Sequence, residues 1–122
     1  KYITDTLFND TLIFILDNLN KIHPFIGTHN EESTTLAIHL MAQAKITNND
    51  PRVWFGQLYG MSDHISYNLA DKGYNVAKYV PFGPVKDVIP YLIRRAEENT
   101  SVAGQTSREL SLIKKERKRR KF

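Results

Sequence analysis

Three side chains in one predicted helix have the types and spacing needed to bind a small carboxylate. Tyr91 precedes Arg94 by three residues and Arg95 by four, so one helix flank can carry the phenol and both guanidinium groups. Neighbouring arginines repel each other unless an anion lies between them, and a carboxylate can accept bidentate, charge-assisted hydrogen bonds from such a pair. The alternative is an ion pair between Arg94 and Glu98, four residues apart, on a solvated face, and spacing alone favours it.

Several other kinds of chemistry lack their motifs. The chain has no cysteine, which excludes disulfides, cysteine-ligated zinc and thiol catalysis. The six glycines never form Gly-x-Gly-x-x-Gly, and there is no Gly-x-Ser-x-Gly, so a Rossmann nucleotide site and a serine hydrolase are disfavoured. No His-x-His or His-Glu-x-x-His pattern occurs, so no metal site is expected from the four histidines, which are His23, His29, His39 and His64.

Hydrophobic periodicity predicts alternating helices and strands. Short apolar strands are expected over residues 24–29, 53–59 and 76–80. The pattern also predicts helices over residues 6–22, 32–45, 62–71 and 83–99, and from about residue 107 into the tail. Asp5 and Ser62 are the expected N-caps, and Gly73 is expected to close the third helix. Pro90 is expected to kink the fourth helix or to cost it a hydrogen bond.

This order predicts an α/β fold with parallel strands. Strand and helix alternate at roughly thirty-residue spacing, as in βαβ units. The strands are apolar at most positions, which predicts burial between helices on both faces. Such strands can belong to an open doubly wound sheet or to a (β/α)8 barrel. A complete barrel needs about 250 residues, so a chain of 122 residues can supply half of one at most.

The basic character of the chain is concentrated at its end. Residues 114–121 hold seven bases and one acid, and the remaining ten bases and twelve acids leave the rest at −2 within a total of +4. The whole-chain charge therefore does not indicate nucleic-acid binding. A non-enzymatic binding module acting through this tail, on nucleic acid or an anionic membrane, is the second class of function considered. A solvated helix end is the simpler interpretation and is favoured.

Four segments resemble, in order, the last four motif blocks of the proline dehydrogenase family. The block around Tyr91 is specific, and the others gain force from their order and spacing. They are Thr28-His29-Asn30, Gln57-Leu58-Tyr59-Gly60-Met61, Lys78-Tyr79-Val80-Pro81-Phe82-Gly83 and Tyr91-Leu92-Ile93-Arg94-Arg95-Ala96-Glu97-Glu98-Asn99. The resemblance implies that residues 1–104 are the C-terminal half of a (β/α)8 barrel and that residues 105–122 form a terminal helix with a basic tail.

The resemblance also implies an activity and a site. The family oxidises L-proline to Δ1-pyrroline-5-carboxylate with FAD, and a quinone then takes the electrons. Arg94 and Arg95 are implied to bind the proline carboxylate. The implied pocket residues are Tyr91, Tyr79 and Leu58, and the implied FAD contacts are Thr28, His29, Asn30 and Glu98.

The resemblance leaves out strands that family members use. A substrate-side lysine, an aspartate and much of the flavin surface come from strands upstream of this chain. The chain alone is therefore expected to be inactive and to self-associate through unpaired strand edges. A cytoplasmic location, with possible peripheral membrane contact, is expected.

Overall fold

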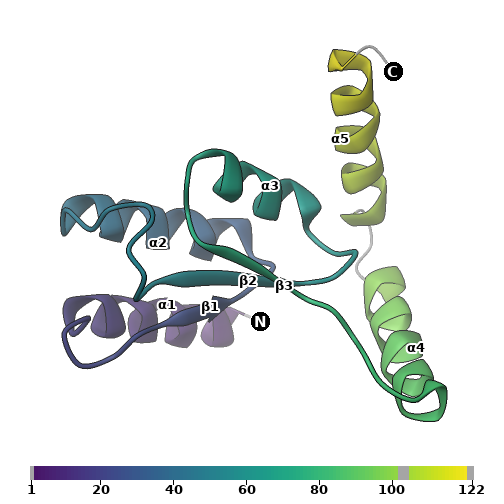
Figure 1. Cartoon of the computed structure of the whole chain (residues 1–122), viewed down its shortest axis with the longest axis horizontal. Coiled ribbons are helices and arrows are strands. Elements are labelled where there is room, and N and C mark those ends of the chain that lie inside the picture. Colours follow the sequence, from purple (N-terminus) through teal and green to yellow (C-terminus); the bar gives the residue numbers. More distant parts are fainter. Residues whose placement is uncertain (1, 102–104, 121–122) are drawn as a thin grey trace. The chain divides into compact units, whose positions relative to one another are not determined.

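The computed structural model describes residues 2–101 and 105–120, and the chain divides into two compact units, Lys1–Tyr79 and Val80–Phe122. The first unit alternates helices and strands, and the second is helical in its described part (Figure 1). The first contains α1 (Tyr2–Asp17), β1 (Phe25–Gly27), α2 (Glu31–Gln43), β2 (Trp54–Leu58), α3 (Asp63–Asp71) and β3 (Val76–Tyr79). The second contains α4 (Val85–Ser101) and α5 (Gln105–Arg119). The domain boundary predicted at residue 104 lies outside the described residues.

The three strands form a parallel sheet in the order β1-β2-β3, which confirms the predicted α/β class. Gly27 pairs with Gly56, which pairs with Ala77, so three small residues form one row across the sheet. All three strands end at the same edge. We call residues 28–30, 59–62 and 79 at this edge the carboxyl edge.

One face of the sheet is covered by helices. Ile26 and Phe55 point into a core to which α1, α2 and α3 all contribute. The buried apolar residues are Leu12, Leu16, Leu19, Ile26, Ala37, Met41, Val53, Phe55, Ile65 and Leu69. Burying such side chains is the main stabilising contribution to a fold of this kind.

The opposite face, which we call the open face, carries the alternate residues. They are Phe25 and Gly27 from β1, Trp54, Gly56 and Leu58 from β2, and Ala77 and Tyr79 from β3. Phe25, Trp54 and Tyr79 are 64%, 40% and 60% exposed. The prediction that helices cover both faces is therefore wrong within this unit, because apolar composition does not tell which face a neighbour covers.

The helix ends depart from the predictions in instructive ways. α1 begins at Tyr2, so Asp5 lies inside its first turn and is not the N-cap. α2 is capped by Asn30, whose Oδ1 accepts from the backbone N–H of Glu32 at 2.9 Å and of Ser33 at 3.4 Å. Gly73 follows the end of α3 with φ +81°, which confirms it as the left-handed residue that ends the helix.

In the second unit, α4 begins directly after Pro84. The Pro84 carbonyl accepts from the N–H of Asp87 at 2.9 Å and of Val88 at 3.1 Å. Pro90 lies inside the helix, where it has no N–H to donate to the carbonyl one turn earlier. None of the described helices is long and apolar enough to cross a membrane.

The amino-terminal edge of the sheet is held by Asp50. Its carboxylate accepts from Arg52 three times, from the backbone N–H at 3.0 Å, from Nε at 2.9 Å and from Nη2 at 2.6 Å. The Asp50 carbonyl accepts from Asn75 Nδ2 at 2.7 Å, which links the residues preceding β2 and β3. The side-chain hydrogen bonds from Arg52, followed by its backbone N–H, lower the pKa of Asp50 from 3.8 to about 2.

We predict that Asp50→Asn destabilises the fold at pH 7 by about 1–2 kcal/mol, since the lowered pKa favours the folded state and Arg52 is partly solvated. The folded pKa lies below the unfolded one, so this stability is present above pH 3.8 and is lost as the pH falls through about 2. Urea unfolding at pH 7, 4 and 2.5 should show the difference between wild type and variant shrinking at the lowest pH. A pH-independent difference would contradict this account.

Gln57 ties three elements together from a buried position. It is 3% exposed, its Oε1 accepts from Ser66 Oγ of α3 at 2.9 Å, and its Nε2 donates to the Thr28 carbonyl at 3.3 Å. A buried amide is stable only when its donors and acceptors are used, so this residue links β2 to α3 and to the end of β1.

We predict that Gln57→Leu, which keeps the size of the side chain, lowers the free energy of unfolding by about 1–3 kcal/mol because it strands buried polar partners. Guanidinium unfolding measures the loss. In a Ser66→Ala background, Gln57→Leu should lower the free energy of unfolding by less, because the Ser66 hydroxyl that would lose its hydrogen-bond partner is already absent. Equal losses in both backgrounds would show that the Gln57–Ser66 bond contributes nothing.

Candidate functional site

A pocket of about 390 Å³ lies on the open face next to the carboxyl edge. Its lining includes three of the residues that sequence analysis selected: His29, Leu58 and Tyr79. Leu58 and Tyr79 are paired across β2 and β3, and His29 follows β1. The other lining residues are Phe25, Gly27, Gly56 and Gln57. Parallel pairing thus brings residues from three separate motifs to one place.

The segment after β1 is shaped by local hydrogen bonds. The backbone N–H of Asn30 donates to Thr28 Oγ1 at 3.1 Å, and Asn30 Oδ1 caps α2. Among the described residues, the structure records no acceptor for the Thr28 hydroxyl hydrogen or for the Asn30 side-chain N–H groups. Both residues are half-buried and can donate to an oxygen-rich ligand.

His29 is held from both sides of its ring. Nδ1 lies 2.8 Å from Ser62 Oγ, and Nε2 lies 3.5 Å from the backbone N of Leu58. Because a backbone N–H can only donate, Nε2 is the acceptor. The neutral ring then carries its hydrogen on Nδ1 and donates it to Ser62.

Ser62 occupies the N-cap position of α3, but its side chain makes no capping hydrogen bond. The predicted serine cap is therefore wrong. The reason is a tertiary contact, because the Ser62 hydroxyl bonds to His29, 33 residues earlier. Ser62 also has φ +51°, a conformation that is uncommon for a residue with a side chain.

In the second unit, α4 presents the predicted arginine flank. The Arg95 guanidinium lies 5.1 Å from the centre of the Tyr91 ring, a cation–π contact. Arg95 Nη2 also lies 2.5 Å from Glu98 Oε1, so the ion pair on this flank joins Glu98 to Arg95 instead of Arg94. Arg94 is exposed. Arg95 is thus fixed within the helix, while Arg94 remains oriented by α4 alone.

The predicted site residues fall into two groups. Thr28, His29, Asn30, Leu58 and Tyr79 belong to the first unit, and the second contains Tyr91, Arg94, Arg95 and Glu98. Each group is internally organised by the contacts described above. That both groups meet around one ligand stays a prediction.

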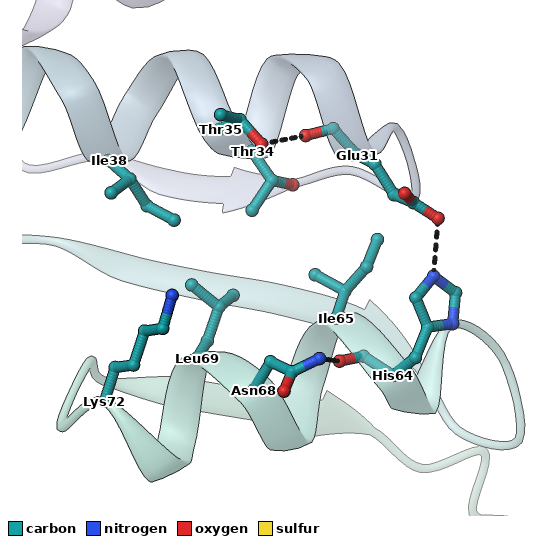
Figure 2. A pocket seen from close by; sticks show the side chains of 9 residues that line it. All are labelled: Glu31, Thr34, Thr35, Ile38, His64, Ile65, Asn68, Leu69 and Lys72. Atoms are coloured by element: carbon teal, nitrogen blue, oxygen red, sulfur yellow. Dashed lines mark hydrogen bonds and ion pairs between the residues drawn. The ribbon is translucent and has the colours of Figure 1, made fainter. Parts of the chain in front are cut away.

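A second pocket, of about 360 Å³, lies between α2 and α3 on the helical side of the first unit (Figure 2). His64 Nε2 and Glu31 Oε1 form an ion pair of 2.8 Å at one end of it. Ile38, Ile65 and Leu69 line the space between the two helices. His64, one of the four histidines from which no metal site is expected, is half-buried here.

The basic tail and metal binding by the histidines were the remaining possibilities. The last turn of α5 contains Arg117, Lys118 and Arg119, where positive charge complements the carbonyl end of a helix, and Lys121 lies outside the described residues. Among the described residues, no three side chains of His, Asp or Glu gather in a group that could hold a metal ion.

Comparison with known proteins identifies relatives of this chain. The family model described as "Proline dehydrogenase" matches residues 1–108. "Proline dehydrogenase 1, mitochondrial" of Dictyostelium discoideum is 46% identical, with 98% of this chain and 22% of the relative covered. The human protein of the same name is 42% identical over 90% of this chain and 19% of its own length. The chain therefore spans about a fifth of the length of these two relatives.

A differently named relative and a solved structure agree with that match. The "Carbapenem antibiotics biosynthesis protein CarD" of Pectobacterium carotovorum subsp. carotovorum is 42% identical over 96% of this chain and 30% of its own length. The crystal structure of proline utilization A from Bdellovibrio bacteriovorus, inactivated by N-propargylglycine, has 28% sequence identity and a TM-score of 0.70. That match covers 78% of this chain and 10% of the other.

The names of the relatives correct one prediction. Those from Dictyostelium discoideum, Homo sapiens and Arabidopsis thaliana are called mitochondrial, so the cytoplasmic location predicted from sequence is wrong. That prediction depended on the absence of cysteine, which carries little information about location.

The matched region, residues 1–108, contains both the carboxyl edge and α4, which carries Arg94 and Arg95. The family model extends over most of the chain, and the relatives named above are similar over nine-tenths of it or more. The chain belongs to the proline dehydrogenase family.

Proposed function

We propose that this chain is part of an FAD-dependent enzyme that oxidises L-proline to Δ1-pyrroline-5-carboxylate and passes the electrons to a quinone. The observation that carries the proposal is the family match over residues 1–108, which includes the Tyr91, Arg94 and Arg95 motif. Since the chain spans only part of its relatives' length, we propose that it is inactive alone and self-associates through its strand edges.

The covering of the sheet supports the C-terminal half of a (β/α)8 barrel. In a doubly wound fold helices lie on both faces of the sheet, whereas in a barrel they lie only outside. In the first unit α1, α2 and α3 pack on one face, and the open face exposes Phe25 and Trp54. The remaining strands of a barrel would cover that open face.

The flavin is proposed to lie against the open face, beside the ring of Phe25. Gly27, Gly56 and Ala77 form a row with little or no side chain, and the Phe25 ring covers Gly56, which is buried. A Cβ atom on Gly56 would come within 2.2 Å of Phe25 Cε1, and one on Gly27 would enter open space. Thr28, His29 and Asn30 at the carboxyl edge would hold the adenosine and phosphate portion, and Glu98 is a further proposed contact.

The protein's contribution to the reaction is to bind and orient proline. The bound flavin supplies the hydride acceptor, which no side chain can replace. Arg94 and Arg95 would grip the carboxylate, and fixing that end of a small ring orients its other carbon atoms. Tyr91 and Glu98 contact Arg95, which would restrict the motion of this guanidinium group before proline binds. Tyr79 and Leu58 would exclude water, which strengthens the ion pairs.

We predict that Arg94→Met in the full-length enzyme raises the KM for proline at least about tenfold, because a charge-assisted hydrogen bond to the carboxylate is lost. Proline-dependent reduction of a dye or quinone, with chemical detection of pyrroline carboxylate, measures it. Arg117→Met, the same change in the exposed last turn of α5, is the matched control. An unchanged KM for proline in Arg94→Met would remove the carboxylate assignment.

We also propose that the basic tail is a solvated helix end and not a binding module. Ending the full-length protein after Ile113 should leave kcat and KM for proline within about twofold, because the bases described there, at positions 114, 115 and 117–120, are exposed and suit the end of a helix. The measurement is the same proline assay on the shortened protein, with flavin content as a second readout. A shortened protein that keeps its flavin but loses electron transfer would favour the binding-module alternative.

A further inference from the structure

Ser62 has a combination of features that capping does not explain. It is 1% exposed and sits in the left-handed region with φ +51°. Serine usually occupies an N-cap to accept from the first turn of the helix, yet its hydroxyl makes no such bond. A strained backbone that keeps a side chain away from its local partner points to a role elsewhere.

The hydroxyl of Ser62 instead contacts the ring of His29, at 2.8 Å from Nδ1. The other ring nitrogen accepts from the backbone N of Leu58 at 3.5 Å. The ring is thus bound to the end of β2 on one side and to the start of α3 on the other. His29 also lines the open-face pocket together with Leu58 and Tyr79. Its orientation in that pocket therefore depends in part on Ser62, which does not line the pocket.

We propose that Ser62 is a positioning residue for flavin binding, which acts by holding the ring of His29 in one orientation. The inference rests on the proposed function, in which His29 contacts FAD. A ring protonated on both nitrogens could not accept from Leu58, and an unanchored ring could rotate about its side-chain bonds. The Leu58 N–H makes Nε2 the acceptor, and the Ser62 hydroxyl then holds the ring in place by accepting from Nδ1–H.

A second link between the same two segments provides an internal comparison. Glu31 and His64 join the first turns of α2 and α3 by an ion pair, but neither lines the open-face pocket. Removing His64 therefore weakens the attachment of α2 to α3 without touching the His29 ring. A purely structural role for Ser62 should resemble the effect of removing His64.

The test is a double-mutant cycle in the full-length apoprotein, with FAD affinity measured by flavin fluorescence titration. We expect Ser62→Ala to weaken FAD binding about threefold to tenfold, the size of one hydrogen bond. In a His29→Ala background, Ser62→Ala should have no further effect, because it acts through the ring. His64→Ala should leave FAD affinity within about twofold while lowering the unfolding midpoint.

Ser62→Gly separates the hydroxyl from the backbone strain. Glycine removes the hydroxyl but adopts φ +51° without strain, so it should lose as much FAD affinity as alanine while being more stable. Additive losses for Ser62→Ala and His29→Ala would overturn the proposal, as would an FAD affinity that follows stability across the Ala and Gly variants.

A readout without flavin separates this inference from the proposed function. In protein labelled with ¹⁵N-histidine, the ring shifts report the tautomer, and His29→Ala identifies the signals. We expect protonation on Nδ1 in the wild type, and in Ser62→Ala a shifted Nδ1 signal and broader ring signals, because the Nδ1–H loses its acceptor while the Leu58 N–H still donates to Nε2. A wild type protonated on Nε2 overturns the inference even if FAD binds. A wild type with the expected tautomer but no affinity for FAD overturns the proposed function and, with it, the flavin role of Ser62.

Discussion

Parallel pairing of β1, β2 and β3 is the constraint on which the rest of the first unit depends. The register that aligns Gly27, Gly56 and Ala77 also decides which side chains face the helices and which face the pocket, because neighbouring residues of a strand point to opposite faces. A slip of one residue would turn Phe55 out of the core and Gly56 into it. The same pairing ends all three strands at one edge, which collects His29, Leu58 and Tyr79 from motifs that are far apart in sequence.

Holding that edge together requires polar contacts between successive strand–helix units. Gln57 reaches the Thr28 carbonyl, His29 meets Ser62, and Glu31 meets His64. Lys78 adds a fourth link, because its Nζ lies 2.7 Å from Asp63 Oδ1 and donates to the Met61 carbonyl at 2.6 Å. Each link joins one strand–helix pair of the first unit to the next pair. The apolar core fixes the helices against the sheet, and these contacts fix the residues that surround the pocket.

The sequence predicted those features that depend on interactions between residues close together in the chain. The alternation of apolar runs predicted the order of the helices and strands, and Gly73 was predicted because only a residue without Cβ takes φ +81° at little cost. The Asp5 and Ser62 caps failed because the chain offered other contacts, an earlier helix start in one case and a distant histidine in the other. The pairing of His29 with Ser62, and of Glu31 with His64, spans 33 residues and has no periodic pattern that could indicate it.

The two edges of the sheet differ in the range of the contacts that hold them. At the amino-terminal edge Asp50 takes three hydrogen bonds from a residue two positions away, a compact arrangement that leaves its carboxylate little capacity to bind anything else. At the carboxyl edge the contacts run between distant segments, and Thr28 and Asn30 keep donors available to a ligand. Contacts of this second kind need a correctly formed sheet before they can exist. The arrangement of this edge is therefore a consequence of the folding of residues 1–79 as a whole and cannot be assigned to any single motif along the chain.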